Sequence, residues 1–135
     1  MSVGEDVRAI QLDVTDQYSI ETSAECIRNK LGRIDVLINN AGISHGGEPG
    51  MKLEDVGKSG KTSVASNDEV RTVFETNVFG VIAVTQAMLP LLRKAPAARI
   101  VNVSSGSGSL TLNADPNYSH REMFGAVYSP SKTCP

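Results

Sequence analysis

Tyr128 and Lys132 are the two residues of this sequence whose types and spacing point most directly to acid–base chemistry. They stand four positions apart in YSPSK, so on a helix both side chains leave the same face about one turn from each other. A free phenol, with a pKa of about 10, is a poor proton donor at neutral pH, and a neighbouring ammonium favours its ionised form. The pair therefore predicts a general acid or base, although the same spacing is also common on solvated helix surfaces.

Asn77 and Ser105 are two further candidates. Asn77 lies within an apolar stripe of a predicted helix, where an amide is costly unless its polar atoms find partners. It is either a functional group or a satisfied core amide bonded to a strand end. Ser105 belongs to a Ser/Gly-rich loop, where a serine either holds a reacting oxygen or simply forms a turn. The stripe consists of Val70, Val73, Phe74, Val81 and Met88.

An alternation of strands and helices is predicted to position these residues. Strands are β-branched and apolar, and helices show apolar residues at three- and four-residue spacing. Strand, helix, strand, helix, strand is typical of an α/β domain with a parallel sheet and crossover helices, and 135 residues fit one domain. We expect strands at 7–14, 34–40 and 99–104, helices at about 16–31 and 66–94, and exposed loops at about 43–66, with at most one turn of helix, and 106–127.

Local signals predict where the helices begin and end. Asp16 or Ser19 suits the N-cap of the first helix, its apolar stripe ends at Leu31, and Gly32 suits its termination. Ser66, with a glutamate three residues later, predicts a capping box for the second helix. Pro130 suits the first turn of a helix that carries Tyr128 and Lys132.

Polar or small residues follow all three predicted strands. Asp13, the run Asn39–Gly42 and the run Ser104–Gly108 stand at equivalent carboxyl ends. In open α/β sheets ligands bind beyond these ends. The sequence therefore predicts a ligand site at this edge.

Taken together, these motifs resemble the short-chain dehydrogenase/reductase family. The resemblance rests on LDVTD around Asp13, NNAG at 39–42, TNVFG around Asn77, NVSS at 102–105 and YSPSK at 128–132. It implies a doubly wound Rossmann fold and the interconversion of a ketone or aldehyde with an alcohol by hydride transfer. Tyr128 would be the general acid/base, Ser105 would hydrogen-bond the reacting oxygen, and Asn77 would bend its helix and offer a carbonyl to a water that links Lys132 to solvent.

The resemblance also implies NAD or NADP as cofactor. Lys132 would depress the pKa of Tyr128 and, with Tyr128, hold the nicotinamide ribose. Asp13 and Val14 would meet the adenine. The motif Asn39, Asn40, Ala41 and Gly42 would lie under the adenosine ribose and brace the sheet. The full-length protein would be a homo-oligomer.

The sequence departs from the family in one respect. It contains no Thr-Gly-x-x-x-Gly-x-Gly phosphate turn, and it reads as a partial NAD(P)-binding domain, 1–135, from the third family strand to the start of the Tyr–Lys helix. In the family strand order 3-2-1-4-5-6-7, the first two strands lie between the strands at 7–14 and 34–40. We therefore expect a gene fragment whose isolated chain is not a stable monomer, binds no pyrophosphate and is catalytically inactive.

Composition limits the remaining function classes. A net charge of −2 without a run of Lys or Arg argues against nucleic acid, and two cysteines indicate neither a disulfide framework nor a metal site. We expect no membrane span, because the apolar stretch 79–92 is short, and a cytoplasmic location, because no leader is recognisable. A serine hydrolase built from Ser105, His120 and Asp115 is the weaker alternative, since no G-x-S-x-G surrounds the serine.

Overall fold

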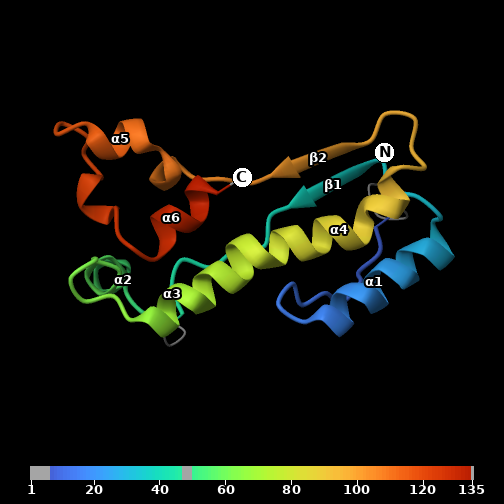
Figure 1. The fold of residues 1–135 in the computed structure, drawn as a ribbon, viewed down its shortest axis with the longest axis horizontal. Helices are drawn as coiled ribbons and strands as arrows, with labels where there is room; N and C mark the ends of the chain where they lie inside the picture. The colour runs from blue at the N-terminus through green and yellow to red at the C-terminus, as the bar shows by residue number, and fades with distance from the viewer. Residues whose placement is uncertain (1–6, 47–49, 135) are drawn as a thin grey trace.

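A short parallel sheet and a long helix form the centre of the fold. The computed structural model describes residues 7–46 and 50–134. Strand β1 (Val36–Asn39) pairs in parallel with β2 (Arg99–Asn102), in a register that sets Val36 opposite Arg99 and Asn39 opposite Asn102. Helix α4 (Val81–Leu92) lies between this sheet and helix α1 (Gln17–Lys30), as Figure 1 shows. The fold is therefore a partial α/β Rossmann fold, as the sequence predicts.

Helix α1 begins and ends at the predicted signals. The Asp16 carboxylate accepts hydrogen bonds from two backbone N–H groups of the first turn. Gly32 adopts a φ of +78°, and its N–H donates to the Ile27 carbonyl, which closes the helix. Ile20 and Ala24 are buried as expected, whereas Leu31 lies just past the last turn and is 58% exposed.

The second helical unit is continuous but changes its winding at Asn77. It consists of α3 (Asn67–Phe74), a π-helical turn at Glu75–Gly80, and α4. The Ser66 hydroxyl caps it by accepting from the Glu69 N–H, which is half of the predicted capping box. The other half is missing, because in the described part of the chain the Glu69 carboxylate makes no hydrogen bond or ion pair.

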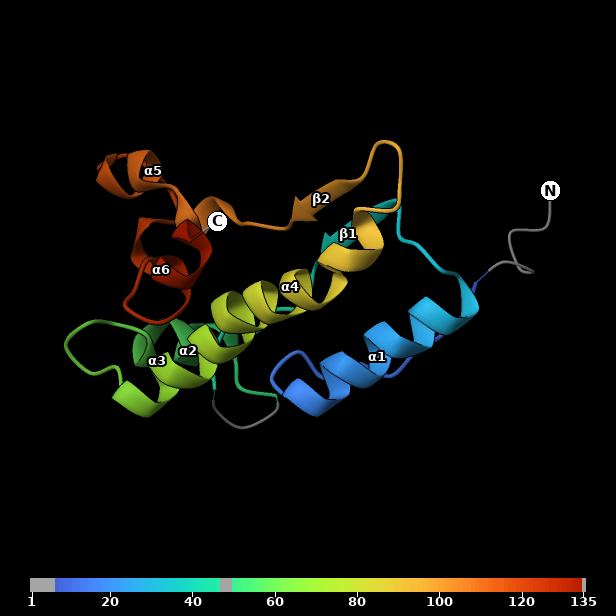
Figure 2. The ribbon, with the colours of Figure 1, turned by 45° about the vertical axis from the view of Figure 1, so that its right-hand side comes forward.

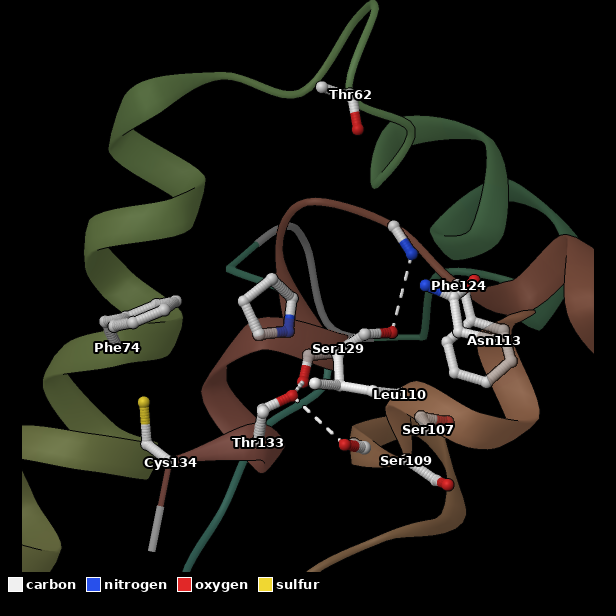
Figure 3. Close-up of a pocket in the computed structure, with 13 residues that line it drawn as sticks. Thr62, Phe74, Ser107, Ser109, Leu110, Asn113, Phe124, Ser129, Thr133 and Cys134 are labelled. Carbon is white, nitrogen blue, oxygen red and sulfur yellow. Dashed lines mark hydrogen bonds between the residues drawn. The ribbon is translucent and has the colours of Figure 1, made fainter.

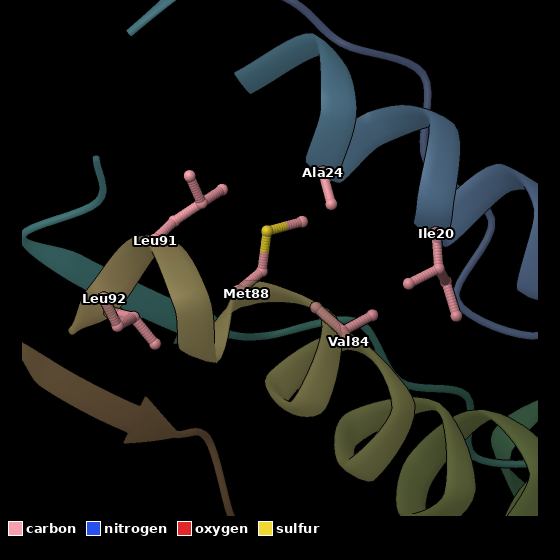
Figure 4. Packing of buried hydrophobic residues seen from close by; sticks show 6 residues of the cluster. All are labelled: Ile20, Ala24, Val84, Met88, Leu91 and Leu92. Carbon is pink, nitrogen blue, oxygen red and sulfur yellow. The ribbon is translucent and has the colours of Figure 1, made fainter. Parts of the chain in front are cut away.

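The hydrophobic core lies between α1 and α4. Figure 2 shows the two helices side by side, and Figure 4 shows their apolar side chains in the space between them. Burying each larger side chain of this kind contributes about 1.5–3 kcal/mol, which makes the helix pair the main source of cohesion. The core side chains are Ile20, Ala24, Val84, Met88, Leu91 and Leu92.

The predicted first strand, at 7–14, is wrong. Residues 7–13 form no strand, because none of the described segments pairs with their backbone. Instead the Ser23 hydroxyl donates to the Gln11 carbonyl at 2.8 Å, and the Asp13 N–H donates to the Ser19 hydroxyl at 2.9 Å. A strand needs a neighbour to satisfy its backbone, and α1 supplies only isolated bonds.

One face of the sheet remains open. Leu37 packs towards the core cluster and Asn39 bonds to α4, so the alternate side chains point to the opposite face. Parallel sheets normally have both faces covered, and this one leaves an apolar surface in water. The exposed side chains are Val36, Ile38, Val101 and Val103.

The two predicted loops contain more helix than expected. The first contains α2 (Leu53–Ser59), and the second contains 3-10 turns at Gly106–Gly108 and Arg121–Met123 and α5 (Leu110–Ala114). Side chains that precede two of these turns explain the difference. The hydroxyls of Ser105 and Ser109 accept from Ser107 N–H and Leu112 N–H, and so cap short helices in Ser/Gly-rich sequence.

The long helix also bears on membrane insertion. Residues Asn67–Leu92 form a helical stretch of 26 residues that contains an 18-residue window with a mean hydropathy of 1.3, which is long and apolar enough to cross a bilayer by length and composition. The sequence-based expectation considered only its most apolar part. The core helix of a soluble protein meets the same criteria, and 28% of the apolar window of this helix is buried in the structure.

Candidate active site

Tyr128 and Lys132 lie together on helix α6 (Tyr128–Thr133), as predicted from their spacing. The Lys132 Nζ atom is 5.7 Å from the centroid of the Tyr128 ring and donates to the Val103 carbonyl at 3.3 Å. Pro130 occupies the first turn of the helix. The two side chains therefore lie on the same side of α6, with the lysine ammonium over the tyrosine ring.

Asn77 joins three segments that are distant in sequence. Its Nδ2 donates to the Ile43 carbonyl at 2.8 Å and to the Ser131 hydroxyl at 2.9 Å, and its Oδ1 accepts from the Ile43 N–H at 2.9 Å. Asn77 is 7% exposed, and its bond to Ser131 is buried, whereas the two bonds to Ile43 are partly buried. The structure agrees with both interpretations of Asn77. It is a satisfied core amide, and the same hydrogen bonds connect α6, which carries Tyr128 and Lys132, to the chain after β1.

Gly42 leaves room for this convergence. A Cβ at this position would lie 3.1 Å from Lys132 Nζ and 3.2 Å from Asn77 Oδ1. Those contacts are tighter than ordinary van der Waals distance, so a side chain would crowd both groups. The glycine of the NNAG motif therefore keeps the space beside the lysine open.

The loop after β2 docks on α6 through backbone and hydroxyl contacts. The Ser104 hydroxyl donates to the Lys132 carbonyl at 2.8 Å, and the Thr133 hydroxyl lies 3.1 Å from the Gly108 carbonyl. A Cβ at Gly108 would collide with the Lys132 carbonyl. Ser104 is thus engaged with the helix backbone, whereas Ser105 lines a cavity together with Tyr128.

Two neighbouring cavities divide the predicted site residues. Ser105 and Tyr128 line one of about 270 Å³, together with side chains from α2 and α3. A second cavity of about 290 Å³ is lined by Asn77 and Lys132, and by Asn39 and Ala41 at the end of β1. The structure therefore groups the four predicted catalytic residues around α6, with the predicted cofactor residues on the side of the sheet.

The two asparagines at the end of β1 differ in burial. Asn39 is 8% exposed, and its Nδ2 donates to Thr85 Oγ1 at 3.0 Å and to Asn102 Oδ1 at 2.8 Å, which braces both strands against α4. Asn40 is exposed and makes no hydrogen bond among the residues described. It lines a small cavity of about 100 Å³ with Val14, Asn39 and Ala41.

Asp13 and Val14 mark the other wall of this small cavity. A Cβ at Gly80 would lie 2.9 Å from the Val14 carbonyl, so the chain crosses the long helix here at close range. The Asp13 carboxylate is exposed and does not line the cavity. Two hydrogen bonds from Thr15 hold the pKa of Asp13 below its ordinary value. The bond from the backbone N–H has the larger effect, and the bond from the hydroxyl has the smaller one.

Two residues that hold α6 in place, Ser131 and Gly108, make contacts that the sequence did not predict. Ser131 is 1% exposed, accepts from Asn77 and donates to the Tyr128 carbonyl at 2.7 Å. Its position three residues after the tyrosine, facing inward on the same helix, is the one signal available beforehand. Gly108 entered the prediction only as the last residue of the run Ser104–Gly108, because its close contact with α6 is non-local.

The geometry does not support the alternative of a serine hydrolase built from Ser105, His120 and Asp115. Over the ranges 7–46 and 50–134, no hydrogen bond joins Ser105, His120 and Asp115. The Asp115 carboxylate accepts from the Asn117 N–H, and the His120 ring lies edge-on against Tyr118. The same ranges contain no group of three or more metal-ligating side chains.

Comparison with known families decides the identity. The family model described as short chain dehydrogenase matches residues 1–120. The chain belongs to the short-chain dehydrogenase family. A curated relative, the short-chain dehydrogenase anuI of Penicillium roqueforti, is 35% identical over 136 residues, covering 98% of this chain and 49% of the relative. The 3-ketodihydrosphingosine reductase of Bacteroides thetaiotaomicron is 37% identical, covering 91% and 41%.

Solved structures of other short-chain dehydrogenases share this fold. The NADPH-bound carbonyl reductase from chicken fatty liver matches with a TM-score of 0.69 and 27% identity, covering 92% of this chain and 46% of the other. A short-chain dehydrogenase from Burkholderia phymatum in complex with NAD matches with a TM-score of 0.69 and 26% identity, covering 96% and 38%. This short-chain dehydrogenase chain thus spans half or less of the proteins that it matches.

Proposed function

We propose that this chain provides the acid–base and ribose-binding part of an NAD(P)-dependent oxidoreductase that interconverts a carbonyl compound and an alcohol. The observation that carries the proposal is the placement of Lys132 Nζ 5.7 Å from the Tyr128 ring, between two cavities that the predicted catalytic residues line. The relatives whose bound NADP(H) or NAD is named support the choice of cofactor. The substrate is a small carbonyl or alcohol compound.

The nicotinamide ribose would bind in the cavity of about 290 Å³ that Asn77 and Lys132 line. Gly42 lies beside these two residues, and a Cβ there would come within 3.1 Å of Lys132 Nζ and crowd the amine. Lys132 would bind the ribose hydroxyls there, with Asn39, Asn40 and Ala41 under the adenosine ribose and Asp13 and Val14 towards the adenine. The nicotinamide supplies the hydride chemistry when it is bound.

The protein's own groups handle the proton. Tyr128 gives a proton to the carbonyl oxygen during reduction and takes it back from the hydroxyl during oxidation. Ser105, which lines the same cavity, donates a hydrogen bond to that oxygen as negative charge develops on it. Asn77 keeps α6 in place through Ser131 and offers its backbone carbonyl to a water near Lys132.

A second proposal concerns the 135 residues by themselves. They contain no Thr-Gly-x-x-x-Gly-x-Gly turn, which is the element that cradles a pyrophosphate at a helix N-terminus. We therefore propose that this polypeptide alone is catalytically inactive. A cytoplasmic location, independence from membranes and nucleic acid, and homo-oligomerisation of the whole protein also stand as proposals.

Hydride transfer by a fusion protein tests both proposals. In the fusion, the chain replaces the matching segment of the Penicillium roqueforti relative, so that every part of that relative outside the match is kept, and NAD(P)H oxidation is followed with ketones and aldehydes. We expect turnover only in the fusion, and a loss of at least about 100-fold in kcat for Tyr128→Phe. Tyr118→Phe is the control, with a change below about threefold. Equal activity of the fusion and its Tyr128→Phe variant refutes the first proposal, and turnover by the separate chain refutes the second.

A further inference from the structure

The Tyr128 hydroxyl is not held in place by a hydrogen bond of its own. Among the residues that the structure describes, the phenol oxygen neither donates nor accepts one. The ring is carried by the first residue of α6. The position of the hydroxyl therefore depends on the backbone of the first turn of this helix.

The Ser131 side chain bonds to that backbone. Its hydroxyl donates to the Tyr128 carbonyl at 2.7 Å and accepts from Asn77 Nδ2 at 2.9 Å. Because the amide donates to the hydroxyl oxygen, the single hydroxyl proton is available for the carbonyl, and both bonds are made at once. Ser131 is 1% exposed, and its bond to Asn77 is buried. The hydroxyl thus connects the first turn of α6 to the long helix.

Asn77 is itself firmly anchored. Its side chain makes hydrogen bonds with both backbone groups of Ile43, at 2.8 and 2.9 Å. Over the described ranges, the bond to Ser131 is the one hydrogen bond between Asn77 and α6. Removal of the Ser131 hydroxyl therefore separates α6 from this anchor while the bonds between Asn77 and Ile43 remain.

The other contacts of α6 do not set the direction of its first turn. Lys132 and Thr133, at the C-terminal end of the helix, bond to residues 103–108. Val127, just before the helix, is 2% exposed, but apolar packing is non-directional. The Ser131 hydroxyl, in contrast, bonds to one atom of this turn, and a hydrogen bond restricts both distance and angle.

Ser129 is the matching serine on the other side of α6. It is 8% exposed and stands two residues from Ser131, so at about 100° per residue the two side chains leave the helix in nearly opposite directions. The Ser129 hydroxyl accepts from the Gly125 N–H at 3.4 Å, and Ser129 lines a cavity of about 720 Å³ beside Phe74 (Figure 3). A change at Ser129 therefore alters α6 without removing the bond to Asn77.

We propose that Ser131 is a positioning residue for Tyr128. Its hydroxyl holds the first turn of α6 so that the phenol lies within reach of the reacting oxygen. This inference rests on the proposed function, in which Tyr128 transfers the proton. A misplacement of about 1 Å at a reacting group can lower the rate about 100-fold, so a small shift of this turn is enough to slow proton transfer.

Two variants of similar shape isolate the hydroxyl in the fusion with the Penicillium roqueforti relative. Threonine keeps a hydroxyl that bonds to the carbonyl three or four residues earlier in a helix, and valine has a methyl group in its place. We expect the kcat of Ser131→Val to be at least about tenfold below that of Ser131→Thr. The KM for NAD(P)H should differ less than about threefold, because Lys132 keeps its bond to Val103 in both. Ser129→Thr and Ser129→Val form the matched control, and their kcat values should agree within about threefold.

Hydrogen exchange of the Lys132 amide in the 135-residue chain gives a readout that needs no turnover. In an α-helix this N–H bonds to the Tyr128 carbonyl, so its protection reports on the first turn. We expect exchange at least about fivefold faster in Ser131→Val than in Ser131→Thr, and equal rates in the two Ser129 variants. If circular dichroism shows that the added methyl group disturbs the fold at either position, Ser131→Ala and Ser129→Ala are each compared with the unchanged chain, with the same expectations.

Three results would overturn the inference: equal kcat of the two Ser131 variants in an active fusion, an equally large difference between the two Ser129 variants, or equal exchange of the Lys132 amide in the two Ser131 variants. Failure of the proposed function looks different. Absence of hydride transfer in every fusion contradicts that function even where exchange of the Lys132 amide depends on the Ser131 hydroxyl, whereas an active fusion whose Ser131 variants behave alike contradicts only this inference.

Discussion

Replacing Asn77 by aspartate should remove the connection between α6 and the chain after β1 at almost constant shape. The aspartate keeps an acceptor for the Ile43 N–H but loses the amide that donates to the Ile43 carbonyl and to the Ser131 hydroxyl. Two net hydrogen bonds are worth about 1–3 kcal/mol, and a carboxylate buried against a carbonyl adds to the loss. We expect Asn77→Asp to lower the free energy of unfolding by about 2–4 kcal/mol.

Urea unfolding followed by circular dichroism measures this loss, and Asn40→Asp is the matched control. Asn40 undergoes the same chemical change at an exposed position without a hydrogen bond among the described residues, so its effect should stay within about 0.5 kcal/mol. Hydrogen exchange gives a local readout, since Asn77→Ala should accelerate exchange of the Ile43 amide by about tenfold or more. Equal destabilisation by Asn77→Asp and Asn40→Asp, or an unchanged Ile43 amide, would refute the role of Asn77.

Two further predictions concern backbone contact and titration. Gly108→Ala should destabilise the chain by about 1–3 kcal/mol, because its Cβ would collide with the Lys132 carbonyl, whereas Gly57→Ala, in open space on α2, should be neutral or slightly stabilising in thermal unfolding. The reasoning fails if both substitutions behave alike. The lowered pKa of Asp13 means that its hydrogen bonds stabilise the turn above the ordinary pKa of about 3.9 and lose this effect as pH falls through the lowered value. Thr15→Val removes the hydroxyl bond but not the backbone one, so NMR titration should show a partial rise in that pKa, and an unchanged pKa would contradict the assignment.

Local signals predicted the helices well because their causes lie within a few residues. Asp16 and Gly32 bound α1 through bonds that span five residues or fewer. The continuous apolar run at 34–40 likewise predicted a strand, and β1 lies within it. The expected strand at 7–14 has the same kind of composition, but strand formation depends on a neighbour elsewhere in the chain, and composition does not provide one.

The candidate site shows the same division. The spacing of Tyr128 and Lys132 is a local property, and it correctly placed both side chains together on α6. The partners of Asn77 are 34 and 54 positions away, so the sequence predicted only that the amide needs partners, not which ones. The cavity beside Phe74 is formed by segments that are far apart in the sequence, so the motifs that contribute to its lining did not predict it.

The hydrogen bonds that Asn77 makes with Ile43 and Ser131 have a consequence for thermal unfolding of this protein. Contacts between distant parts of a chain close long loops, whereas each helix holds itself through near neighbours. Gentle warming should therefore free the segment around Ile43 and release α6 while α1 and α4 keep their winding. The far-ultraviolet circular dichroism spectrum of such a sample would still be that of a helical protein, although the proposed ribose site beside Lys132 would already be lost.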